Sequence, residues 1–133
     1  MKIAVYEDLW NDVRLRYKRF LGEHDVQIYL HLINEKIFTR GREYLIENGF
    51  PSETLHFGLP QEIPEADLHF CDGLNGHCFN ILPKLPKGKS FLTSGDEEIR
   101  EIARSKGFNV LTTLRELEGI VASANSRAKS KSL

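Results

Sequence analysis

The chain has 133 residues, which is enough for one domain with a single hydrophobic core and too few for two ordinary domains. Hydrophobic residues make up 41% and charged residues 28%, so the composition excludes a fibrous repeat and a wholly disordered chain. With 18 basic and 19 acidic side chains the net charge is -1, and we expect neither nucleic acid nor a membrane as a partner.

Two cysteines are too few for a disulfide framework. The N-terminus does not resemble a signal peptide, and we expect a cytoplasmic protein.

The first part of the chain alternates strand and helix. Lys2 to Tyr6 is a short apolar strand, and an amphipathic helix follows the acidic pair Glu7-Asp8. In this helix the apolar positions recur at helical spacing, and the basic residues are expected on its other face. These basic residues are Arg14, Arg16, Lys18 and Arg19. Val26 to Leu30 is a second strand, and a second helix runs from about Asn34 to the stop signal Asn48-Gly49.

A long connector then leads to a buried strand. Residues 50–66 carry three of the five prolines and show no helical period, although Thr54 to Phe57 could add a short edge strand. Leu68 to Cys71 is a strand that ends at Asp72, and Ile81, Leu82 and Leu85 indicate a short helix after it.

The last third repeats the strand and helix pattern twice. Ser90 to Thr93 is a strand, followed by a helix whose capping box runs from Ser94 to Glu97. Phe108 to Leu111 is the next strand, and a second capping box, Thr113 to Glu116, begins the final helix. We therefore assign residues 1–124 to the domain, and predict that residues 125–133, which are polar and basic, form a disordered tail.

Five strands alternating with five helices predict an α/β fold with a parallel sheet and helices on both faces. In such open sheets, functional groups collect at the carboxyl ends of the strands. Glu7 and Asp8 end the first strand, Asp72 ends the third, and Thr93 and Ser94 end the fourth. Three crowded carboxylates repel one another unless a cation neutralises them, and a hard divalent ion such as Mg²⁺ prefers oxygen ligands.

This arrangement resembles the receiver (CheY-like) domain of two-component response regulators over nearly the whole chain. The resemblance implies a doubly wound, flavodoxin-like sheet with strand order 2-1-3-4-5. It also implies that Asp72 accepts a phosphoryl group from a phosphohistidine donor, with Thr93 as the switch hydroxyl and Ser94 as the fallback. By the same resemblance, Mg²⁺ is held by Glu7, Asp8, Asp72 and the backbone carbonyl of Leu74.

The resemblance further implies partners and an output. A histidine kinase or a histidine phosphotransfer protein would supply the phosphoryl group. The phosphorylated protein would then change a protein-protein interaction surface for a downstream partner or a second copy of the chain. Its enzymatic activity would be at most its own phosphorylation and dephosphorylation.

Two departures from the receiver pattern keep alternatives open. Receivers place a lysine at the end of the fifth strand, where this sequence has Thr112, and Asn109 stands near the place of the usual aromatic residue. A pseudo-receiver that binds proteins without phosphorylation therefore remains an alternative. An aspartate-nucleophile phosphatase of the haloacid dehalogenase type is a weaker one, because it needs a second aspartate at the position of Leu74.

Overall fold

The computed structural model describes residues 1–132 and contains five strands and five α-helices linked by loops and short 3₁₀ turns. The strands are β1 (Lys2–Glu7), β2 (Asp25–Leu30), β3 (Leu55–Phe57), β4 (Leu68–Cys71) and β5 (Ser90–Leu92). The helices are α1 (Trp10–Tyr17), α2 (Glu35–Glu47), α3 (Cys78–Ile81), α4 (Glu97–Ser105) and α5 (Leu114–Ser132). The α/β class and the parallel sheet predicted from the sequence are confirmed.

The strand order is β3-β2-β1-β4-β5, so the predicted order 2-1-3-4-5 is wrong. Two segments account for the difference. Leu55 to Phe57, within the connector, pairs with the free edge of β2 and becomes a full member of the sheet. Phe108 to Leu111 forms only one isolated bridge, between Leu92 and Val110. The four remaining segments keep their expected neighbours, with β2 on one side of β1 and β4 then β5 on the other.

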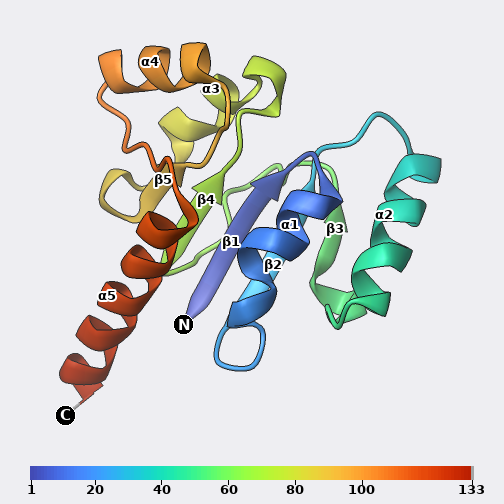
Figure 1. Cartoon of the computed structure of the whole chain (residues 1–133), viewed down its shortest axis with the longest axis horizontal. Coiled ribbons are helices and arrows are strands. Elements are labelled where there is room, and N and C mark those ends of the chain that lie inside the picture. The colour runs from blue at the N-terminus through green and yellow to red at the C-terminus, as the bar shows by residue number, and fades with distance from the viewer. Residues whose placement is uncertain (133) are drawn as a thin grey trace.

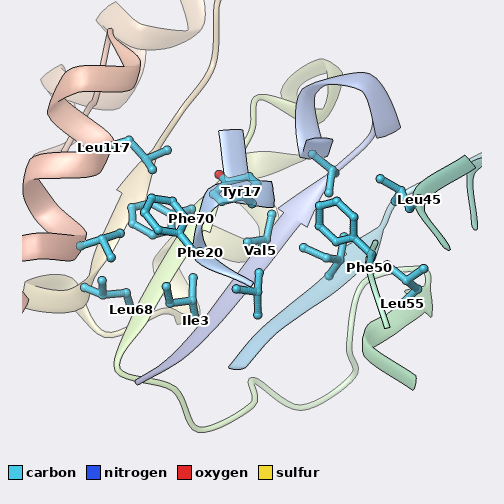
Figure 2. Packing of buried hydrophobic residues seen from close by; sticks show 14 of the residues in the cluster. Ile3, Val5, Tyr17, Phe20, Leu45, Phe50, Leu55, Leu68, Phe70 and Leu117 are labelled. Carbon is cyan, nitrogen blue, oxygen red and sulfur yellow. The ribbon is translucent and has the colours of Figure 1, made fainter. Parts of the chain in front are cut away.

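Helices cover both faces of the sheet (Figure 1). On one face, α1, α2 and α5 pack against the alternate sheet residues Ile3, Val5 and Phe70, and Figure 2 shows these apolar side chains gathered there. The ring centroids of Tyr17 in α1 and Phe70 in β4 lie 5.9 Å apart. On the other face, α3 and α4 cover Ala4, Tyr6, Cys71 and Leu92. The period-two alternation of the strands thus feeds two separate cores.

The predicted ends of α2 and the predicted start of α5 are confirmed. Asn34 caps α2 by accepting a hydrogen bond from the Ile37 amide at 2.9 Å, and Gly49 beyond its C-terminus has a φ of 96°. Thr113 and Glu116 form the predicted capping interaction at α5, where the Glu116 amide donates to Thr113 Oγ1 at 3.1 Å.

The predicted capping box at α4 is wrong. The cap is Asp96, whose carboxylate accepts from the amides of Glu98 and Ile99, and Ser94 lies in the preceding turn. The final helix also differs in extent, because α5 continues through Ser132, across most of the segment for which composition predicts a disordered tail. Residue 133 lies outside the described residues. No helix within residues 1–132 is long and apolar enough to cross a membrane.

Candidate functional site

The sheet order places its switch point between β1 and β4. From β1 the chain first builds β2 and β3 on one side, and then crosses over to build β4 and β5 on the other. In open parallel sheets, ligands bind outside the carboxyl ends of the strands where the direction of winding reverses. Glu7 ends β1, Asp8 follows it, and Asp72 follows β4, so the three predicted metal ligands lie at this reversal.

Backbone register aligns the functional side chains. The amide of Asp72 donates to the Tyr6 carbonyl at 2.9 Å, and the amide of Thr93 donates to the Cys71 carbonyl at 2.8 Å. The parallel ladder therefore continues one step past the ends of β4 and β5. Glu7, Asp72 and Thr93 stand in a row across three neighbouring strands. Since side chains alternate along a strand, this row shares the face of Val5 and Phe70, which is the face that α1 covers.

The three carboxylates come together as the sequence predicted. One oxygen from each of Glu7, Asp8 and Asp72 lies within 4.8 Å of the others. Glu7 is fully buried, and its Oε1 accepts from the amide of Asp8 at 3.1 Å. Asp8 Oδ1 is buried and has no hydrogen-bond partner within the described part of the chain. An unpartnered carboxylate oxygen in a buried position is costly, and a cation is the group that would satisfy it.

Burial and the neighbouring carboxylate of Asp72 raise the pKa values of Glu7 and Asp8. Burial raises the pKa of Glu7 well above its ordinary value, the neighbouring Asp72 raises it further, and Arg16 opposes both effects. Burial also raises the pKa of Asp8, again with Asp72 adding to the shift. Glu7 and Asp8 therefore resist carrying their negative charges without further cations. This is the electrostatic condition under which a divalent ion stabilises a site.

The cation present in the cluster is Arg16 of α1, which the sequence analysis placed wrongly on the solvent face of its helix. Its Nη1 donates to Glu7 Oε2 at 3.0 Å, lies 3.6 Å from Asp72 Oδ1, and donates to Thr93 Oγ1 at 3.4 Å. Arg16 follows the buried Val13 by three residues and precedes the buried Phe20 by four. That helical spacing puts it on the core side of α1, and this is the signal by which the sequence could have revealed it.

Thr112 stands where the receiver pattern expects a lysine, and its side chain does not enter the carboxylate cluster. Its hydroxyl donates to Glu116 at 2.6 Å. Arg16 brings a positive charge from α1 to Asp72 and to the Thr93 hydroxyl.

The loop after Asp72 is held tightly against the end of β5. A Cβ added at Gly73 would lie 2.7 Å from Ser94 Oγ, so a side chain there would force its neighbours to shift. Leu74 and Asn75 both have positive φ angles, 52° and 53°, which are uncommon for residues other than glycine. The Leu74 carbonyl accepts a hydrogen bond from the His77 amide at 3.0 Å, and its predicted role as a metal ligand stays a prediction.

Thr93 and Ser94 have different surroundings, although they are adjacent. Thr93 Oγ1 accepts a hydrogen bond from Arg16, which also contacts Glu7 and Asp72. Ser94 Oγ accepts from the Asp96 amide at 3.1 Å and so stabilises the turn before α4. Of the two hydroxyls proposed as a switch, only Thr93 contacts Arg16.

An open cleft of about 280 Å³ gives access to the cluster. Three of the candidate site residues named from the sequence line it: Asp8, Asp72 and Ser94. It is also lined by two further aspartates that the sequence analysis did not single out, Asp12 of α1 and the helix cap Asp96. Asp12 Oδ2 lies 3.9 Å from Arg16 Nη2, one helical turn away. The cleft therefore combines four aspartates with one guanidinium, which suits a divalent cation together with an anionic ligand.

Comparison with models of known families, with curated proteins and with solved structures found no match to this chain. The fold and the site above therefore rest on the sequence and the structure alone.

Proposed function

We propose that this chain is an atypical receiver: it accepts a phosphoryl group on Asp72 and holds Mg²⁺ with Glu7, Asp8, Asp72 and the Leu74 carbonyl. The observation that carries the proposal is the buried, unpartnered Asp8 Oδ1 within a cluster of three carboxylates that also meets Arg16 and Thr93. The residues fit the ion, because all the side-chain ligands are carboxylate oxygens. The order of the sheet differs from that of receivers, so the support comes from the site rather than from the topology.

In the proposed step, an oxygen of the Asp72 carboxylate attacks phosphorus and forms a new P–O bond. The P–N bond of the donor phosphohistidine breaks, and its imidazole leaves with the bonding electron pair, neutral if its other nitrogen carries a proton. Mg²⁺, when bound, neutralises charge on the transferred phosphoryl oxygens. Arg16 and Thr93 stand beside Asp72 and would donate to those oxygens.

The proposed output follows from the charge that is added. An acyl phosphate at Asp72 brings about -1.5 to -2 charges next to Arg16. Arg16 would then share its donors between Glu7 and the phosphoryl group, and the Thr93 hydroxyl would turn toward the same oxygens. Both movements would reach the surface, through α1 and through the β5 end that leads to α4. We propose a histidine kinase or phosphotransfer protein as the donor, and a downstream protein or a second copy of the chain as the partner.

One observation favours the pseudo-receiver as a second candidate. The ion pairs of Arg16 with Glu7 and Asp72 already neutralise part of the cluster from within the chain. A protein that uses this cation alone would keep the fold and its binding surface without Mg²⁺ or phosphorylation. The two candidates therefore differ in whether the carboxylates respond to Mg²⁺. No observation favours the phosphatase, since Leu74 occupies the place of its second aspartate and is buried.

The deciding experiment combines Mg²⁺ with beryllofluoride, a mimic of the acyl phosphate, and follows backbone amide NMR shifts. We expect saturable changes at Asp72, Thr93 and Arg16 in the wild-type protein, and none in Asp72→Asn. Asp25→Asn is the matched control, because Asp25 lies at the opposite edge of the sheet and should leave the response intact. Acetyl phosphate should add one phosphoryl group by mass spectrometry, again only when Asp72 is present.

Two outcomes would contradict the receiver. If millimolar Mg²⁺ with beryllofluoride leaves the amide spectrum unchanged, the pseudo-receiver is the better account. If the protein hydrolyses phosphate esters with multiple turnovers, the site is a phosphatase and Asp72 is not a signalling acceptor.

A further inference from the structure

A second cleft, of about 160 Å³, shares Arg16 with the acidic one. We call it the Arg16–Arg100 cleft. Its polar lining consists of two guanidiniums and three hydroxyls, and the rest is leucine. The polar residues are Arg16, Thr93, Arg100, Thr112 and Thr113. Of the described residues that line it, none is acidic, whereas four aspartates line the neighbouring cleft.

Arg100 is held in a fixed position on this cleft. It belongs to α4, its side chain is 18% exposed, and its Nε donates to the Ser94 carbonyl at 2.7 Å. Its Nη1 donates to Glu97 at 3.1 Å. A guanidinium that is already ordered loses little conformational freedom when it binds an anion, and its planar fork suits the oxygens of a phosphate.

An anion of the chain itself already occupies the hydrogen-bond donors at the edge of this cleft. Glu116 Oε1 accepts from the Thr112 amide at 3.1 Å, from the Thr112 hydroxyl at 2.6 Å and from the Thr113 hydroxyl at 3.2 Å. Glu116 is exposed, so it can leave these donors at small cost. The donors lie at the N-terminus of the 19-residue helix α5, where backbone amides favour negative charge.

We propose that the Arg16–Arg100 cleft binds a phosphate group, either inorganic phosphate or the phosphate of a larger ligand. Arg100 and Arg16 supply the positive charge, and Thr93, Thr112 and Thr113 supply neutral donors. The apolar part of the lining includes Leu111 and Leu117, which are buried, and Leu15, which is exposed. The cleft shares Arg16 and Thr93 with the carboxylate cluster, whereas Arg100, Thr112 and Thr113 line this cleft and not the acidic one. Phosphate binding here does not depend on whether Asp72 accepts a phosphoryl group.

The test is a titration of the metal-free protein with inorganic phosphate, with chloride as the ionic-strength control, followed by amide and arginine Nε NMR shifts. We expect saturable shifts at Arg100, Thr112 and Thr113. Arg100→Gln should weaken phosphate binding about tenfold, because it removes a charge-assisted hydrogen bond. Arg104→Gln is the matched control, since Arg104 also pairs with Glu97 from α4 but does not line the cleft.

A second variant gives a result of opposite sign and guards against misfolding of Arg100→Gln. Glu116→Gln weakens the internal competitor, and should tighten phosphate binding several-fold. Asp72→Asn should bind phosphate at least as well as the wild type, which separates this site from the proposed acceptor. Tighter binding of phenyl phosphate than of inorganic phosphate would indicate an ester as the ligand, and the reverse order would indicate the free ion.

The proposal is overturned if phosphate produces no saturable shifts at Arg100, Thr112 and Thr113. It is also overturned if Glu116→Gln leaves the affinity unchanged, or if a folded Arg100→Gln protein binds phosphate as tightly as Arg104→Gln. Shifts that chloride reproduces at equal ionic strength would equally exclude a specific site.

Discussion

Replacing Arg16 by glutamine tests whether one guanidinium holds the carboxylate cluster together. The change removes the partner of Glu7, which is fully buried and 3.0 Å away, and the neighbour of Asp72, whose side chain is 12% exposed. Breaking a buried ion pair by removing one partner costs about 3–5 kcal/mol. Glu7 can take up a proton instead, so we expect a smaller loss in the free energy of unfolding, about 2–3 kcal/mol at pH 8.

The dependence of this loss on pH distinguishes the cluster from ordinary surface charge. The pKa of Glu7 is raised in the folded protein, so the folded state retains the proton to a higher pH than the unfolded chain does. Stability therefore falls as the pH rises above the ordinary value of 4.5, until Glu7 is ionised in both states. Without Arg16 the pKa of Glu7 rises further, so the loss caused by the substitution should shrink to below about 1 kcal/mol at pH 5.

The assay is urea denaturation at pH 5, 6, 7 and 8, in buffer with a chelator. Arg14→Gln is the matched control, because Arg14 lies on the same helix, is exposed and donates a hydrogen bond to the Tyr44 hydroxyl at 3.3 Å. We expect the control to stay within about 0.5 kcal/mol of the wild type at every pH. Equal stability of the Arg16 and Arg14 variants across the range would refute the account of the cluster given above.

Two further predictions concern the neighbourhood of Asp72. Gly73→Ala would place a Cβ 2.7 Å from Ser94 Oγ, and we expect the free energy of unfolding to fall by about 1–3 kcal/mol in urea denaturation. Gly95→Ala has open space at the same edge and should cost much less, so equal effects would argue against the close approach. Burial raises the pKa of both thiols, that of Cys78 to about 11. Because thiolates are the reactive species, we expect Cys71 and Cys78 to react with an aromatic disulfide reagent at pH 8 at least about 100-fold more slowly in the native protein than in guanidinium; comparable rates would contradict the buried placement.

Local patterns in the sequence predicted the elements well, and predicted the pairing of short strands poorly. Apolar runs bounded by turn and cap residues located β1, β2, β4 and β5. These signals are local, because each one is carried by a few consecutive residues. The single bridge at Val110 and the membership of Leu55 to Phe57 depend on which sheet edge is free, and that is decided by strands far away in the chain. An error of this kind changes the strand order even when the elements are right.

The same distinction applies to the site. The position of Glu7, Asp8, Asp72 and Thr93 at one edge could be predicted from the amino-acid order, because parallel strands bring all their carboxyl ends to the same side. The entry of Arg16 into the cluster could not be predicted in this way, since the direction of its side chain depends on how α1 packs across the sheet. The packing of α1 against the sheet therefore decides whether the Arg16 guanidinium reaches the side chains at the ends of the strands.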